Sequence, residues 1–325
     1  MYKILGIGNA LVDVMTLIPD DSILEKFSLP KGSMQLVDKD KSVLVKKETE
    51  KLNRSLTSGG SAANTIHGLA MLGVETEFIG SIGKDDLADF FENDMKKAGI
   101  RTLLTRRDSV TGTAVALISN DSERTFATHL GAAVELEAAD LNPIDFKGQN
   151  LLYLEGYLIY NKPLVEAACR FARNENMKIA LDLASYNVVE SCLADFRDII
   201  EKYVDILFAN EDEARAFTGL EPEEALDAIS KICEVAVIKV GGEGSWIKRD
   251  SEVIKIGTVD VDVKDTTGAG DLYAAGFLYG YSRNKNLEIC GQYGALMAGN
   301  VIEVLGAKMD NERWHKMKTV ISGME

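Results

Sequence analysis

The chain has 325 residues, of which 46% are hydrophobic and 27% charged, and this composition indicates a folded globular protein long enough for one large α/β domain. Its net charge of −15 argues against nucleic acid and anionic membranes as partners, because both carry the same sign of charge. No apolar run approaches the ~20 residues that a membrane-spanning helix needs, so no membrane span is expected.

The first predicted strand, residues 3–8, follows no cleavable signal pattern, so we expect a cytoplasmic protein. Asn9 and Asp13 come just after the end of this strand. The carboxyl ends of strands in an open α/β sheet border the ligand crevice. Both polar side chains are therefore candidates for substrate binding.

Several short β-like runs in the first part of the chain are separated by polar turns, and they predict a small sheet apart from the main one. The polar segment 120–123 predicts a hairpin turn between the last two runs. The runs lie at residues 13–18, 33–37, 102–105, 113–119 and 124–128.

Residues 58–73 are mostly small, which predicts a helix packed very close to its neighbours and ended by Gly73. Gly59 and Gly60 at its start would let a ligand reach the backbone. Asn64 lies one turn further on, on the side nearest the helix start. A tightly packed core helix with an incidental Asn64 is the alternative interpretation.

From about residue 151 the pattern becomes a regular alternation of strands and helices, which predicts right-handed βαβ units and a parallel sheet. Strands are expected at 150–155, 178–183, 204–209 and 235–240, with further strand-like runs at 245–249 and 253–257. Helices are expected at 162–175, 187–202, 211–219, 222–233, 269–282 and 286–304, with a helical tail around 311–322.

Residues 265–271 (Asp-Thr-Thr-Gly-Ala-Gly-Asp) are expected to join a β-like run at 259–263 to a buried helix. The unpaired N–H groups and partial positive charge of a helix start attract anions, and the small residues 268–270 let an anion approach closely. An acid beside an anion cradle suits phosphoryl transfer, in which Asp271 takes a proton from a hydroxyl while the cradle holds the phosphoryl group. A glycine-rich turn capped by an acid is the structural alternative.

Several stretches, in the expected order, resemble the ribokinase-like (phosphofructokinase-B type) carbohydrate kinases, a family that includes the adenosine kinases. The resemblance covers about residues 3–308 and implies a three-layer α/β/α domain with a mostly parallel central sheet. One domain would span residues 1–325, with a small β-sheet lid formed by about 12–18, 33–37 and 101–128. The stretches are Gly8-Asn9 with Asp13, Gly59-Gly60 with Asn64, residues 210–213, 239–244 and 265–271, and Asn300.

The resemblance implies an ATP-dependent kinase that uses Mg²⁺. Asp271 would be the general base, the backbone of Gly268, Ala269 and Gly270 the anion hole, and Arg124 a residue that closes onto the phosphates. Nucleotide and Mg²⁺ binding is implied for Asn210, Glu213, Lys239, Gly241, Gly244 and Asn300. Some relatives bind K⁺ through the residues at the positions of Asp265 and Thr267, so K⁺ is a further expectation.

Some of these stretches also have a purely structural interpretation. Asn210 and Glu213 have the spacing of a helix cap, and residues 241–244 have the composition of a hairpin turn. Asn300 within a helix is also compatible with packing or capping alone.

The acceptor is expected to be a small molecule with hydroxyl groups, held by Asn9, Asp13, Gln35, Gly59, Gly60 and Asn64. The spacing from Asn9 to Asp13 is closer to the adenosine kinases than to the ribokinases, which favours a purine nucleoside. A sugar kinase of the fructokinase or ribokinase type is the first alternative, and a catalytically silent binding protein the second. The sequence leaves open whether the protein is a monomer or a homodimer.

Overall fold

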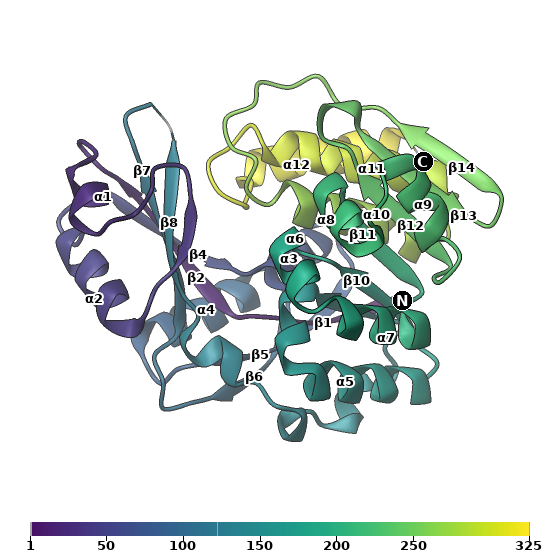
Figure 1. Ribbon diagram of the computed structural model, residues 1–325, viewed down its shortest axis with the longest axis horizontal. Coiled ribbons are helices and arrows are strands. Elements are labelled where there is room, and N and C mark those ends of the chain that lie inside the picture. The colour runs from purple at the N-terminus through teal and green to yellow at the C-terminus, as the bar shows by residue number, and fades with distance from the viewer. Residues whose placement is uncertain (1, 122, 325) are drawn as a thin grey trace.

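The strands of the computed structural model, which describes residues 2–121 and 123–324, form one nine-stranded and one five-stranded sheet (Figure 1). The large sheet has the order β14-β13-β12-β11-β10-β9-β1-β5-β6. Its strands are β1 (Lys3–Ile7), β5 (Glu75–Ile82), β6 (Arg101–Arg106), β9 (Leu151–Glu155), β10 (Lys178–Asp182), β11 (Ile206–Asn210), β12 (Val235–Lys239), β13 (Ser245–Arg249) and β14 (Glu252–Ile256).

The large sheet is parallel from β6 to β12, and β13 and β14 continue it as an antiparallel edge. Strand β1 lies between β5 and β9, with Ile4 beside Thr76 and Leu151. The inner strands are apolar on both faces, as expected for a parallel sheet that helices cover on both sides. The predicted fold class is confirmed.

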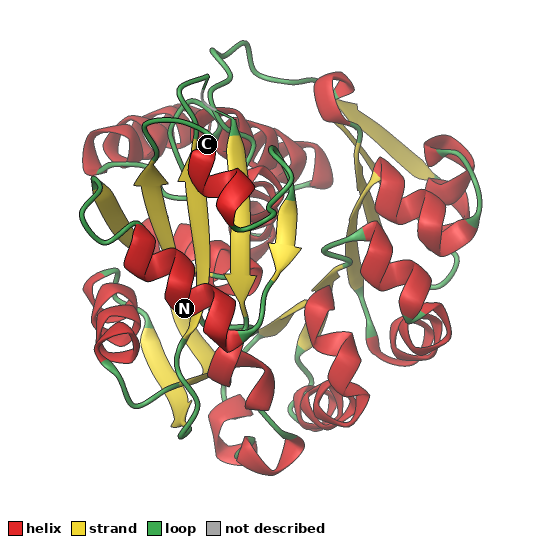
Figure 2. Ribbon diagram, turned by 60° about the vertical axis from the view of Figure 1, so that its left-hand side comes forward, coloured by secondary structure: helices red, strands yellow, loops and turns green. Residues whose placement is uncertain are grey.

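Helices cover both faces of the large sheet (Figure 2). Tyr153 in β9 packs with the core around α3, α10 and α11, whereas its neighbours Leu152 and Leu154 pack with the core around α5, α7 and α9. The helices are α3 (Ser61–Met71), α4 (Asp86–Lys97), α5 (Lys162–Asn174), α6 (Tyr186–Ser191), α7 (Leu193–Tyr203), α8 (Glu211–Thr218), α9 (Pro222–Ile229), α10 (Ala269–Ser282), α11 (Leu287–Val301) and α12 (Asn311–Met324). Short 3₁₀ turns are η1 (Gly131–Glu135), η2 (Ala138–Asp140), η3 (Pro143–Phe146), η4 (Gly156–Asn161) and η5 (Gly241–Glu243).

The small sheet stands beside the large one and has the order β3-β8-β7-β2-β4 (Figure 1). Its elements are β2 (Leu11–Leu17), β3 (Met34–Leu36), β4 (Arg54–Gly59), β7 (Gly112–Ile118) and β8 (Arg124–His129), with helices α1 (Ser22–Lys26) and α2 (Lys39–Glu48). The predicted hairpin is present, because β7 and β8 pair in antiparallel orientation. Only three residues separate β1 from β2, so the two sheets are closely linked at this point.

Several predicted details were wrong. Residues 101–106 were expected in the small sheet, but β6 pairs in parallel with β5, because α4 returns the chain to the large sheet as a βαβ unit. Strand β4 joins the small sheet in its place. Residues 259–263 are a loop rather than a strand, and the helix expected at 187–202 is broken at Cys192, whose φ of −127° is not helical.

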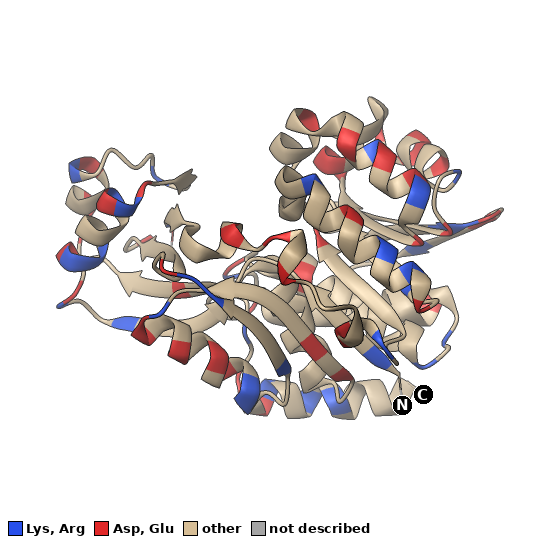
Figure 3. Cartoon of the chain, turned by 90° about the horizontal axis from the view of Figure 1, so that it is seen from below, with Lys and Arg blue, Asp and Glu red and all other residues tan. Residues whose placement is uncertain are grey.

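Figure 3 shows acidic and basic residues along the outer helices of the molecule. Both signs of charge are interspersed there, with ion pairs such as Lys96–Glu92 at 2.5 Å and Lys202–Asp198 at 2.5 Å. None of the helices within residues 2–121 and 123–324 is both long and apolar enough to cross a membrane.

Candidate active site

A cavity of about 1690 Å³ lies between the small sheet and the carboxyl edge of the large one. Residues from distant parts of the chain line it, and most of the predicted site residues are among them. These are Asn9, Asp13, Gln35, Gly60, Asn64, Asn210, Glu213, Lys239, Gly241, Gly244, Thr267, Gly268, Ala269, Gly270 and Asp271. The strand ends and helix starts therefore meet at one place, as the topology of open α/β sheets predicts.

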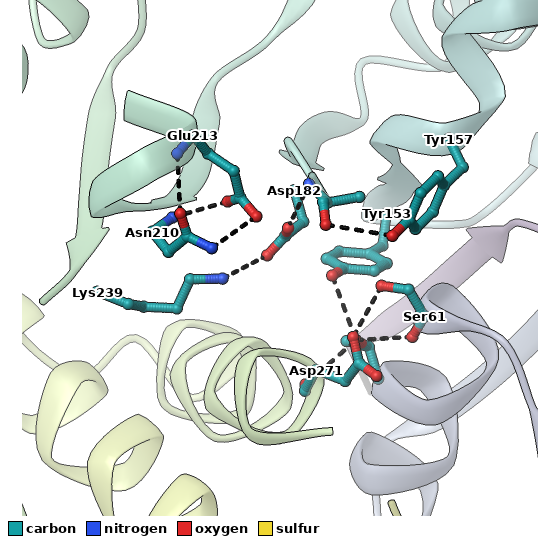
Figure 4. A network of polar contacts seen from close by, with 10 residues as sticks. Ser61, Tyr153, Tyr157, Asp182, Asn210, Glu213, Lys239 and Asp271 are labelled. Atoms are coloured by element: carbon teal, nitrogen blue, oxygen red, sulfur yellow. Dashed lines mark hydrogen bonds and ion pairs between the residues drawn. The ribbon is translucent and has the colours of Figure 1, made fainter. Parts of the chain in front are cut away.

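Asp271 lies in the first turn of α10 and is held by two donors from α3. Ser61 Oγ donates to its Oδ1 at 2.7 Å and Asn64 Nδ2 to its Oδ2 at 3.0 Å (Figure 4). Burial raises the pKa of Asp271 to about 6, although these two hydrogen bonds lower it. A carboxylate with a pKa close to neutral is suited to accept a proton and release it again.

The turn before α10 requires glycine at position 268. Gly268 has φ +77°, and a Cβ there would lie 2.9 Å from Ala307 Cα. At the start of α10, Ala269 N donates to Thr266 O at 3.2 Å and Leu272 N to Gly268 O at 2.8 Å. The N–H groups of Gly270 and Asp271, which lie in the first turn and have no partner inside the helix, are available to an anion. The Lys239 ammonium lies beside this helix start, because a Cβ placed on Gly270 would be only 3.1 Å from Lys239 Nζ. Lys239 thus adds a full positive charge to the partial charge of the helix start.

Asp182 at the end of β10 orients this lysine. Lys239 Nζ donates to Asp182 Oδ2 at 2.8 Å, and both side chains are largely buried (Figure 4). Burial lowers the pKa of Lys239, but the charges of Asp182 and Glu213 outweigh that effect and raise it. The ammonium is therefore charged where it meets the start of α10.

Asn210 and Glu213 form the predicted helix cap at the start of α8, and the same two residues line the cavity. Glu213 N donates to Asn210 Oδ1 at 2.8 Å, and Asn210 N and Nδ2 donate to the Glu213 carboxylate at 2.7 and 2.8 Å (Figure 4). Burial raises the pKa of Glu213 to about 7, with Lys239 acting against it. The cap thus fixes a carboxylate at the cavity wall beside Asp182 and Lys239.

Glu155 at the end of β9 joins the β1–β2 loop to the first turn of α3. Asn9 N and Nδ2 donate to Glu155 Oε1 at 2.9 and 2.6 Å, and Ala62 N donates to Oε2 at 2.8 Å. Gly60, which directly precedes α3, has φ +100°, and a Cβ there would overlap Asn9 O. Burial raises the pKa of Glu155 to about 7.

Two polar groups near Asp271 suit hydroxyl groups of an acceptor. Asn64 Oδ1 is buried and lacks a hydrogen-bond partner among the residues that the structure describes. The Asp13 carboxylate lies against Gly59, where a Cβ would overlap it. Burial raises the pKa of Asp13 to about 7, Lys308 lowers it and Asp271 raises it further.

Four predicted site residues are absent from the cavity wall as far as the described residues go: Gly59, Arg124, Asp265 and Asn300. Both ends of the Asn300 amide already have partners, because its Nδ2 donates to Leu296 O at 2.9 Å and its Oδ1 accepts from Arg313 Nη1 at 3.4 Å. The adjacent residues Ala298 and Gly299 line the cavity instead.

The residues expected to bind K⁺ do not fit that ion as they are arranged. Arg124 Nη1 forms an ion pair with Asp265 and donates to Thr267 Oγ1 at 3.3 Å. The other partners of the Asp265 carboxylate are Thr267 N at 3.0 Å and Gly306 N. A guanidinium therefore already supplies a positive charge there. Arg124 Nε and Nη2 are buried without a partner within the described residues.

Sequence reasoning missed Glu155, Asp182 and Ser61. The first two share a signal that was available, because each is the acidic last residue of a buried apolar strand. In a parallel sheet this position faces the ligand crevice. Ser61 was treated only as a possible helix cap, and its contact with Asp271 depends on the packing of α3 against α10.

Comparison with known proteins gives a consistent result. The family model described as pfkB family carbohydrate kinase matches residues 32–314. The crystal structure of an adenosine kinase from Sinorhizobium meliloti is 33% identical, covers 98% of this chain and 99% of its own, and has a TM-score of 0.88. A probable sugar kinase from Rhizobium etli CFN 42 is 31% identical, covers 98% of each chain, and also has a TM-score of 0.88. Adenosine kinase 2 of Arabidopsis thaliana is 25% identical over 93% of this chain and 94% of that protein.

Proposed function

The chain belongs to the pfkB family of carbohydrate kinases, and from this premise we propose that it transfers the γ-phosphoryl group of ATP to a hydroxymethyl group of a purine nucleoside. The observation that carries the proposal is the position of Asp271, between the partnerless Asn64 Oδ1 and the cationic start of α10 at Gly270 and Lys239. A base thus stands between a place for a hydroxyl and a place for a phosphoryl group.

The chemistry follows from these charges. Asp271 is mostly ionised above pH 6 and takes the proton of the acceptor hydroxyl as its oxygen attacks the γ-phosphorus. The N–H groups at the start of α10 and the Lys239 ammonium stabilise the charge on the phosphoryl oxygens as the bond to ADP breaks. Arg124 lies beside this turn, paired with Asp265 and Thr267, and would donate to the phosphates only if its side chain turned toward the cavity.

The carboxylates of Asp182 and Glu213 are the kind of ligands that Mg²⁺ prefers when it also binds nucleotide phosphates. Within the described residues no three His, Cys, Asp or Glu side chains are arranged as a complete metal site. This fits an ion that is held largely by ATP and water. When bound, Mg²⁺ would neutralise part of the phosphate charge that this acidic protein otherwise repels.

The glycines of the β12–β13 turn, Gly241 and Gly244, line the cavity on the same side as Asn210 and Lys239. Both have positive φ, +49° and +93°, so the turn presents backbone rather than side chains to the cavity. We assign this side of the cavity to the nucleotide of ATP.

Exposed apolar side chains favour a nucleoside over a free sugar as the acceptor. Met34, Leu36, Val134 and Tyr160 line the cavity but are 54%, 66%, 56% and 66% exposed. An aromatic base between them would bury apolar surface, at roughly 25 cal/mol per Å², whereas a monosaccharide would leave these side chains in water. Gln35 on β3 offers an amide to the polar edge of such a base.

A sugar kinase is the second candidate, because Asn9, Asp13 and Asn64 would bind the hydroxyls of any polyol, and a relative of similar identity is called a probable sugar kinase. The deciding experiment measures ADP release with adenosine, inosine, ribose, fructose and tagatose. Turnover with adenosine supports the nucleoside proposal. Turnover with free sugars alone contradicts it, and no stimulation by any acceptor contradicts the kinase assignment.

A further inference from the structure

An ion pair with a buried ammonium connects three segments that are far apart in the sequence. Lys308 Nζ, on the connection between α11 and α12, donates to Asp94 Oδ2 in α4 at 2.7 Å and also contacts Ser58 Oγ at the end of β4. Asp94 Oδ2 in turn accepts from Ser58 N at 3.0 Å and Ser58 Oγ at 2.7 Å. The Lys308 side chain is only 12% exposed.

Such a pair is not explained by stability alone. The Lys308 ammonium is largely withdrawn from water, whereas the Asp94 side chain is 30% exposed. Burying a charge costs free energy, and apolar residues of similar size often stabilise a protein as well as an ion pair or better. The question is therefore what the positive charge does at this place.

Ser58, which this pair holds, lies next to the acceptor side of the cavity. Ser58 directly precedes Gly59, and the Asp13 carboxylate lies against Gly59. β2 and β4 pair here, with Asp13 opposite Thr57 and Leu11 opposite Gly59. The charge of Lys308 thus lies behind the carboxylate that faces the acceptor.

The same connection also touches the turn that forms the anion cradle. Gly306 N donates to the Asp265 carboxylate, and Ala307 packs so closely on Gly268 that a side chain there would collide with it. Three consecutive residues, 306–308, thus contact both the cradle and the acceptor side. Replacing Lys308 removes the charge next to Ser58, while Gly306 and Ala307 keep their contacts with the turn that forms the cradle.

We propose that Lys308 is a positioning residue for phosphoryl transfer: its ammonium, anchored by Asp94, increases the ionised fraction of the Asp13 carboxylate, the form that accepts hydrogen bonds from the acceptor hydroxyls. The inference rests on the proposed role of Asp13 in acceptor binding. It adds the group that makes this role workable in a site where burial favours the neutral acid.

Burial raises the pKa of Asp13, and the charges nearby act on this pKa in opposite directions. The groups that act on Asp13 are Lys308, which lowers its pKa, and Asp271, which raises it. The groups that act on Lys308 are Asp94 and Asp13, and both raise its pKa, although burial lowers it overall. His67 also faces Lys308 and Asp94, but burial lowers its pKa to about 3, so it stays neutral.

The first test needs no acceptor. In enzyme labelled with ¹³C at the aspartate carboxyl carbons, the Asp13 resonance is assigned by its loss in Asp13→Asn and followed against pH. We expect a midpoint near 7 in the wild type and, in Lys308→Met, a midpoint about one pH unit higher, as loss of a nearby opposite charge predicts. An unchanged midpoint would overturn the inference.

The second test is kinetic and uses adenosine. A rise of one pH unit in the pKa of Asp13 lowers its ionised fraction about fivefold at pH 7, so kcat/KM for adenosine should fall about fivefold and recover at high pH. The KM for ATP should stay within about twofold. A loss that is equal at all pH values, or that affects ATP equally, would indicate a merely structural role.

Two further variants separate charge from folding. Lys308→Met leaves Asp94 unpaired, so the double variant Asp94→Asn with Lys308→Met removes both charges and keeps an acceptor for Ser58 N. It should melt close to the wild type and still show the raised midpoint of Asp13; a normal midpoint in this variant would contradict the proposal. Lys308→Arg should restore the wild-type midpoint. Lack of adenosine turnover by the wild type would refute the proposed function, whereas the carboxyl titration decides the role of Lys308 independently.

Discussion

Asp271→Asn should make the enzyme slower and the fold more stable at the same time. Asparagine keeps the shape of the side chain but cannot take the proton of the acceptor hydroxyl. Loss of a general base typically lowers the rate about 10²–10⁴-fold, so we expect kcat to fall by that factor. Binding of adenosine and ATP should change little, because the cradle and the Asn64 amide remain.

The stability effect has the opposite sign for a reason that is visible in the structure. Burial raises the pKa of Asp271 from 3.8 to about 6, so the ionised form is unfavourable in the folded protein. Because the pKa of Asp271 is higher in the folded state than in the unfolded state, protonation of this carboxyl stabilises the fold. This contribution is fully present below the pKa of the unfolded state and is lost as the pH rises through the pKa of the folded state. A shift of about two units corresponds to about 3 kcal/mol at most, and this cost is fully present above pH 7.

The assay is thermal melting of the wild type and Asp271→Asn between pH 4 and pH 8, beside steady-state turnover. We expect the variant to melt a few degrees higher at pH 8, since a free-energy change of about 1–3 kcal/mol divided by the large unfolding entropy of a chain of this size gives a small shift in melting temperature. The difference should shrink toward pH 4. Near-normal turnover would remove Asp271 as the base, and a lower melting temperature at pH 8 would refute the electrostatic argument.

Three further predictions concern the neighbours of this site. Glu155→Gln leaves one acceptor oxygen for the donors of Asn9 and Ala62. The KM for adenosine should therefore rise at least about tenfold, while the KM for ATP stays within about twofold. An equal change in both KM values would contradict the assignment of Glu155 to the acceptor side. Gly60→Ala introduces a Cβ that overlaps Asn9 O, so it should abolish acceptor binding measured by calorimetry. The matched control is Gly73→Ala, at a position that also has positive φ but has nothing within 4 Å of the added Cβ. This control should lose only stability. Because Arg124 occupies the residues expected to bind K⁺, replacing KCl by tetramethylammonium chloride should change kcat less than about twofold, and a tenfold fall would show that K⁺ is required.

Local sequence signals were sufficient for much of this protein. Residues 265–271 and 58–64 were predicted to belong to the site because each has small residues at a helix start, and the structure places both starts at one cavity. The alternation of apolar runs and amphipathic helices after residue 151 predicted the parallel sheet, because each βαβ unit is determined within about 30 residues. The parallel orientation of these strands and the helices between them followed from these local rules.

Other features depend on contacts between distant residues, which no local pattern contains. Strand β6 has the composition of its lid neighbours, and only its pairing with β5 decides that it belongs to the large sheet. The contact of Asn300 with Arg313 in α12 is likewise a long-range feature, because no pattern around residue 300 contains it.

The same distinction applies to the turn at residues 265–271. The sequence by itself determined that small residues start a helix here with an acid in its first turn, because glycine geometry and helix polarity are local properties, and from this it predicted an anion cradle. Only the tertiary structure decided the charge environment of that acid and of Asp13, since Glu155 and Asp182 line the cavity from other strands and Lys308 lies behind its wall, next to Ser58. Electrostatic interactions act through space, so the pKa values of these carboxylates depend on folding rather than on neighbours along the chain.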